Sequence, residues 1–182
     1  MKNSLQRKFE QQEFDNGYQL VNGVAMHAEN GDRFQIPHTV LKKHVRHGHF
    51  VEVRIDSPRF SAHPDAPARC TCPHCNEAAT KPILSHEHPA SLLELPRQNV
   101  PSRGWGEDFW VQIKERDREL LRGTIDNPLY EARLHGLDQG DEFVLHDDHI
   151  LAVHASHRRE LILGMNSEEL KELAQWLGSQ RD

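Results

Sequence analysis

Hydrophobic and polar residues alternate along several short stretches of this chain, which is the pattern of half-buried β-strands. The clearest examples are residues 50–55, 109–114 and 142–146. Residues 120–125 repeat the pattern directly after Arg116-Asp117-Arg118, so the segments on either side of this turn predict a β-hairpin. Several such strands in one chain favour a mainly β fold.

Shorter β patterns precede and follow these strands. Residues 18–21 and 24–28 flank Asn22-Gly23, a dipeptide that strongly favours the tight turn of a hairpin. Residues 130–134 and 150–154 predict two further short strands. Strands of this length and spacing are typical of a small β-barrel, and the helices give the fold an α+β character.

Helical periodicity is strongest near the C-terminus. Asn166 is placed to cap the first turn of a helix, and Glu169 follows three residues later to complete a capping box. Residues 3–14 and 39–46 predict shorter helical segments. We expect the C-terminal helix to be amphipathic and to close one side of the barrel. Its predicted buried stripe consists of Leu170, Leu173, Ala174 and Leu177.

The composition changes between the two groups of strands. Eight of the ten prolines and all three cysteines lie between Ser57 and Arg103. A loop of this length within a compact domain needs something else to order it. We therefore expect three parts: a β-rich N-terminal half (1–56), a Pro/Cys/His-rich insertion that binds zinc (57–104), and a β-rich C-terminal half with the closing helix (105–182).

The three cysteines lie close together, at Cys70, Cys72 and Cys75, and two histidines follow at His86 and His88. Three thiolates and one imidazole form the closed, tetrahedral ligand set of a structural zinc ion. We expect zinc as a structural cofactor that orders the insertion, with either histidine as the fourth ligand. The alternatives are unligated cysteines in a mobile loop, or copper(I), which the lack of a nearby methionine disfavours.

Two other groups of histidines have the spacing of possible metal ligands. His44, His47 and His49 are interleaved with basic residues, so a solvated basic turn is the favoured interpretation. His146 and His149 flank two aspartates, but Asp-Asp is common at a hairpin tip, and adjacent side chains of a strand point to opposite faces. The sequence contains no nucleotide-binding or serine-hydrolase motif. We assign no catalytic residue, and enzymatic activity is disfavoured.

The chain is acidic. It has 22 lysines and arginines against 28 aspartates and glutamates, a formal net charge of −6 with neutral histidines. This charge disfavours a protein that coats nucleic-acid backbones and suits a basic protein partner. The chain shows neither an apolar run of membrane-spanning length nor a signal-peptide pattern, and its thiols are clustered, so we expect a cytoplasmic protein with no membrane partner.

Several short motifs resemble those of bacterial proteins that carry the domain of unknown function 2314. They are Phe34-Gln35-Ile36-Pro37, Gly48 to Val53, Phe109-Trp110-Val111, Gly123 with Asp126-Asn127-Pro128, and Gly140-Asp141-Glu142-Phe143. The resemblance covers the segments 33–56 and 105–153. It implies a small β-rich module from a bacterium and supplies no activity. The cysteine-bearing insertion and the C-terminal helix depart from the family pattern.

Together these observations favour a non-catalytic protein-interaction module with a structural zinc site, such as an inhibitor or an immunity protein that neutralises its partner. Trp105 and Trp110 are candidates for the partner-binding surface, although core packing of at least two of Trp105, Phe109 and Trp110 competes with that role. A metal-dependent hydrolase and a nucleic-acid-binding zinc module are the alternatives.

Overall fold

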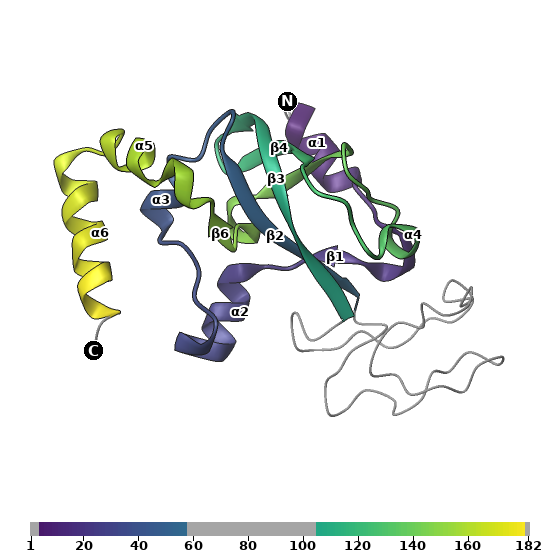
Figure 1. Ribbon diagram of the computed structural model, residues 1–182, viewed down its shortest axis with the longest axis horizontal. Coiled ribbons are helices and arrows are strands. Elements are labelled where there is room, and N and C mark those ends of the chain that lie inside the picture. Colours follow the sequence, from purple (N-terminus) through teal and green to yellow (C-terminus); the bar gives the residue numbers. More distant parts are fainter. Residues whose placement is uncertain (1–3, 58–104, 181–182) are drawn as a thin grey trace.

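The computed structural model describes residues 4–57 and 105–180 (Figure 1). The first range contains α1 (Ser4–Gln11), β1 (Gln19–Leu20), α2 (Gly23–Asn30), α3 (Thr39–Lys43) and β2 (Phe50–Ser57). The second contains β3 (Trp105–Asp117), β4 (Leu120–Ile125), α4 (Ala132–His135), β5 (Glu142–His146), η5 (Asp147–His149), β6 (Ala152–Val153), η6 (Ala155–His157), α5 (Arg158–Leu163) and α6 (Ser167–Ser179). No helix in these two ranges has the length and apolar character needed to cross a membrane. The predicted zinc ligands lie outside the described residues: Cys70, Cys72, Cys75, His86 and His88.

The strands form one antiparallel sheet in the order β1-β2-β3-β4-β5, and β6 also pairs with β2. β1 pairs with Ile55 and Asp56 near the end of β2, whereas β6 pairs with Val51 and Glu52 near its beginning. The two short strands therefore share one edge of β2. The sheet curves into a nearly closed, barrel-like shape (Figure 1). The predicted β-rich, barrel-like fold with a C-terminal helix is confirmed at this level.

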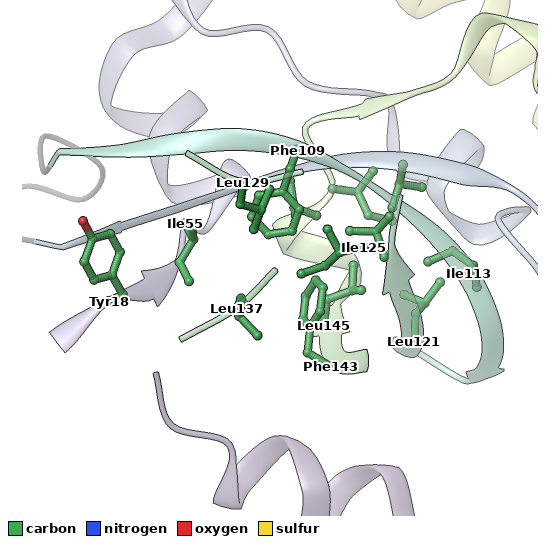
Figure 2. Packing of buried hydrophobic residues seen from close by; sticks show 14 of the residues in the cluster. Tyr18, Ile55, Phe109, Ile113, Leu121, Ile125, Leu129, Leu137, Phe143 and Leu145 are labelled. Carbon is green, nitrogen blue, oxygen red and sulfur yellow. The ribbon is translucent and has the colours of Figure 1, made fainter. Parts of the chain in front are cut away.

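The longest pairing joins β2 to β3, from Phe50 opposite Gln112 to Ser57 opposite Trp105. Successive side chains of a strand point to opposite faces, so alternate residues along the middle of both strands enter the core. Figure 2 shows how these side chains meet others from β4, β5 and the loops that follow β4. The inward-facing residues of the pair are fully buried: Val51, Val53, Ile55, Phe109, Val111 and Ile113.

The predicted N-terminal helix is present as α1, and it covers β4 and β5. Leu5 and Phe9 lie one turn apart and pack against Leu120 and Val144. Gln12 follows the helix and fastens its end to β5, because its side chain donates to the carbonyl of Val144 (2.9 Å) and accepts from the amide of the same residue (2.7 Å).

The C-terminal helix has the predicted capping box at Asn166, but it buries a different face. Leu173 packs with residues of α3 and α5, whereas Leu170 and Leu177 remain 39% and 50% exposed. Trp176, which lies off the predicted stripe, packs against the same cluster. Among the described residues, the apolar neighbours of the helix come from two short helices, an edge strand and the connections beside them, so they cover a narrower stripe than a complete core would.

The predicted hairpin around Asn22-Gly23 is wrong. Asn22 instead caps α2, because its side-chain oxygen accepts a hydrogen bond from the amide of Ala25 (2.9 Å). Asn-Gly is common both in hairpin turns and at helix N-termini. Which structure forms depends on the strand with which β1 pairs. Gln19 and Leu20 pair with the end of β2 and not with the residues that follow them.

The predicted strand at 130–134 is also wrong, since this segment contains the short helix α4. A buried polar network holds it in place. The hydroxyl of Tyr18 donates to Glu131 (2.8 Å), and the carboxylate of Glu107 accepts from the amides of Tyr130 (2.9 Å) and Glu131 (2.8 Å) and contacts His135 Nε2 (3.0 Å). The hydrogen bonds of these buried groups stabilise the helical conformation, and this effect outweighs the weak local preference for a strand. The strand expected at 150–154 is confirmed only for Ala152–Val153.

Gly123 is a position where the fold requires a glycine because of close approach. A Cβ atom there would lie 2.3 Å from Val111 Cγ1 and 3.0 Å from the carbonyl oxygen of Gln112, both on the neighbouring strand. We predict that Gly123→Ala lowers the free energy of unfolding by about 1–3 kcal/mol through overpacking. Chemical denaturation measures this change.

Gly178 provides the matched control. It lies in α6, and a Cβ atom there would meet nothing within 4 Å. Gly178→Ala should leave the stability unchanged or raise it by up to about 1 kcal/mol, because alanine favours a helix over glycine. Equal losses in the two variants would contradict the close approach at Gly123.

Candidate functional site

Three side chains with metal-ligand chemistry converge where β2 begins and α5 begins. We call them the His–Glu cluster: His49, His157 and Glu160. His49 directly precedes β2, and its carbonyl accepts from the amide of Ile113 on β3 (2.8 Å). His157 ends η6, and Glu160 lies one turn further on in α5. The cluster thus joins two parts of the chain that are far apart in sequence.

The rings of His49 and His157 stack, with centroids 4.7 Å apart and an interplanar angle of 28°. One nitrogen or oxygen atom from each member of the cluster lies within 4.8 Å of the other two. His49 is only 3% exposed, and its Nε2 lies 3.4 Å from Glu160 Oε2. Within the described residues, neither His49 Nε2 nor His157 Nε2 has a hydrogen-bond partner.

The surroundings set the charges of this cluster. Burial lowers the pKa of His49, with a smaller contribution from the neighbouring His157. The Arg46 guanidinium, which pairs with Glu160 Oε1, holds the pKa of that carboxyl below its ordinary value. A neutral imidazole therefore faces an ionised carboxylate. No other group of three such side chains within the described ranges is close enough to share one ion.

An aromatic strip continues from the cluster over the outer face of β2 and β3. Phe50 stacks on His157 (centroids 5.8 Å apart), and Trp110 meets His154 edge-on at 5.2 Å. Trp110 is half-buried, and its backbone amide donates to the side chain of Asn127 (2.8 Å). Trp110 is thus neither fully buried nor fully exposed, while Trp105, the first residue of β3, has a side chain outside the described part of the chain.

α5 also borders an apolar groove. Its volume is about 420 Å³, within the range of roughly 300–1,000 Å³ that ligand sites occupy. Of the described residues that line it, Arg158 alone is charged. Ile162 and Leu177 at the groove are 43% and 50% exposed. We call this feature the apolar groove, and its walls include Ile36, Leu41, Val153, Leu161, Trp176 and Leu177.

The other histidine groups singled out in the sequence do not form a site. His44 contacts Glu169 of α6 at 3.1 Å, His47 is exposed, and His49 alone points into the cluster. His47 therefore fits the predicted solvated turn. The sequence analysis missed His157 and Glu160. Their spacing, His157-x-x-Glu160, is a signal that could have found them, because residues three apart lie on the same side of a helix.

The segment from His146 to His149 is structural. His146 Nδ1 accepts from the amide of Asp148, and His149 Nδ1 accepts from the amide of His146, both at 3.1 Å. Arg116 secures this turn to α3, since it donates to Asp147 Oδ2 (2.6 Å) and to the carbonyls of Lys42 and Val45 (2.9 and 3.1 Å). The segment forms a 3₁₀ turn and not the expected hairpin tip.

Searches of the family models, the curated proteins and the solved structures gave no match to this chain. The resemblance to proteins with the domain of unknown function 2314 therefore stays a prediction that depends on short motifs. Two of these motifs, Gly48 to Val53 and Gly140 to Phe143, are turns that lead into β2 and β5.

We predict that His149 makes the stability of the protein depend on pH. Burial lowers the pKa of His149 from 6.5 to about 4. The folded state therefore binds fewer protons than the unfolded state between these values. Stability from this residue is complete above about pH 6.5 and is lost as the pH falls toward 4, on the order of 3 kcal/mol in total.

His149→Asn tests this prediction, because the asparagine side-chain oxygen can replace Nδ1 as the acceptor for the amide of His146 but does not titrate. Urea denaturation at several pH values should show a shallower loss of stability for this variant than for the wild type. His47→Asn, at an exposed site, serves as the control. A pH profile that is identical in wild type and His149→Asn would refute the prediction.

Proposed function

We propose that this chain is a non-catalytic protein-interaction module that binds an amphipathic helical segment of another protein in the apolar groove. The observation that carries the proposal is the groove itself, which has Ile162 and Leu177 exposed beside Trp176. Covering apolar surface of this kind contributes about 25 cal/mol per Å² to binding before the cost of association. A helix that presents apolar residues on one face is the partner that such a groove fits.

The charge of the groove defines the partner further. Arg158 has no ion-pair partner among the described residues, and it lies among apolar side chains. An aspartate or glutamate beside the apolar face of the bound helix would pair with it. The proposed ligand is therefore an acidic amphipathic segment, even though the whole chain has a net charge of −6. The local charge decides here because salt screens more distant charges.

The proposal extends to the biological role of the protein and to its zinc ion. Binding of this kind suits an inhibitor or an immunity protein in the cytoplasm, with zinc at Cys70, Cys72, Cys75 and one of His86 and His88 as a structural cofactor. The aromatic strip at Trp110 would extend the contact. The alternatives are a metal-dependent hydrolase and a nucleic-acid-binding zinc module, neither of which uses the apolar groove.

Selection of helical peptides tests the groove. A phage-displayed library of amphipathic peptides, panned on the full-length protein, should yield sequences with apolar residues at helical spacing and at least one acidic residue. The selected peptides should bind Ile162→Glu at least about tenfold more weakly, since a buried carboxylate is costly in an apolar site. Fluorescence anisotropy measures these affinities.

The controls distinguish binding in the apolar groove from non-specific binding elsewhere on the surface. Tyr130→Glu changes a side chain that is 91% exposed and lies outside the groove, so it should not alter peptide affinity. Selection on Arg158→Glu should favour lysine or arginine in place of the acidic residue. Peptides that bind Ile162→Glu as well as the wild type would refute the proposal.

Removing one cysteine thiolate tests whether the predicted ligands bind a zinc ion. We predict that the purified protein retains about one zinc ion per chain after dialysis against a weak chelator. Cys72→Ser should lose this ion and melt at a lower temperature, because the free energy of zinc binding contributes to folding. Ser85→Ala, within the same insertion, is the control. Unchanged zinc content and an unchanged melting curve in Cys72→Ser would contradict the zinc proposal.

A further inference from the structure

We propose that the His–Glu cluster binds a zinc ion through His49 Nε2, one ring nitrogen of His157 and a carboxylate oxygen of Glu160. Its ligands are other residues than the predicted cysteine ligands, and none of them lines the apolar groove. Two imidazoles and one carboxylate form a common three-ligand set for zinc, and a water molecule would complete the tetrahedron.

The distances support this assignment. Zinc–nitrogen and zinc–oxygen bonds of 2.0–2.2 Å in a tetrahedron place the ligand atoms about 3.3 Å from one another. His49 Nε2 and Glu160 Oε2 are already 3.4 Å apart. All three ligand atoms lie within 4.8 Å of one another, so rotation of the partly exposed His157 and Glu160 side chains brings them to bonding distance.

The second observation is the poor hydrogen bonding of the two imidazoles. His49 is 3% exposed, and its Nε2 has no hydrogen bond among the described residues, only the 3.4 Å contact with Glu160 Oε2. Nε2 of His157 is buried and likewise has no hydrogen-bond partner in this part of the chain. Buried nitrogens without a good hydrogen bond are costly, and a bound ion would satisfy both.

The charges of the ligands also suit a cation. Zinc takes neutral imidazole nitrogens and carboxylate oxygens as ligands, and the cluster supplies two of the former and one carboxylate. Arg46 occupies Glu160 Oε1, while Oε2 faces His49. The two carboxylate oxygens can thus serve Arg46 and the ion at the same time.

Arg46 sets the strength of the site. Its guanidinium repels a cation at Glu160, and its amide donates to His49 Nδ1 at 3.3 Å. Zinc on Nε2 requires the ring proton on Nδ1, so that long hydrogen bond is lost on binding. Both effects weaken the site, and we expect zinc there to exchange readily, unlike a closed structural site.

Zinc titration of the full-length protein tests the site, with free zinc set by a competing chelator and bound zinc measured by elemental analysis. The wild type should bind one more zinc ion than His157→Ala, or bind it at least about tenfold more tightly. Glu160→Gln should behave like His157→Ala. His47→Ala, on the same turn as His49 but exposed, should match the wild type. The cysteines are intact in all four proteins, so their zinc cancels in the comparison.

Arg46→Gln distinguishes a metal site from a plain ion-pair network. Removing the guanidinium should tighten zinc binding several-fold, because the repulsion at Glu160 disappears. A network without a metal would only lose an ion pair. Equal zinc binding in wild type and His157→Ala, or weaker zinc binding in Arg46→Gln, would overturn the proposal. Circular dichroism of each variant without zinc confirms that it folds.

Discussion

The antiparallel pairing of β2 with β3 holds together two parts of the chain that residues 58–104 separate in sequence. Every other strand of the sheet builds on this pair: β4 and then β5 extend it on one side, while β1 and β6 share the free edge of β2. The pairing also places two sets of inward-facing side chains opposite each other. Their burial away from water is the main source of stability for the barrel-like sheet.

The pairing of β6 with β2 brings the residues of the candidate sites together. β6 binds the beginning of β2 with Val153 opposite Val51, and the amide of His154 donates to the carbonyl of Phe50 (3.0 Å). This register sets the residues after β6 beside those before β2, so His157 meets His49. α5 contributes to both sites: Glu160 completes the cluster, and Arg158, Leu161 and Ile162 line the apolar groove.

Sequence patterns correctly predicted the elements for which the local preference and the tertiary contacts favour the same conformation. Alternation identified β2, β3, β4 and β5, and the capping box identified α6. The predictions from sequence were wrong where one local pattern is compatible with two different structures. Asn22-Gly23 suits both a hairpin and a helix cap, and the short apolar run at 130–134 yielded to a network built on Tyr18 and Glu107. In both cases a distant part of the chain decided.

The sequence alone determined the β-rich class, the main strands with their inward faces and the start of the last helix, because period-two alternation and helix capping act between near neighbours. Only the tertiary structure decided that His49 lies against His157 and Glu160, since side chains more than a hundred positions apart meet through strand register and not through spacing. It also decided that Leu170 and Leu177 stay exposed, because burial depends on which elements surround a helix and not on the helix's own periodicity.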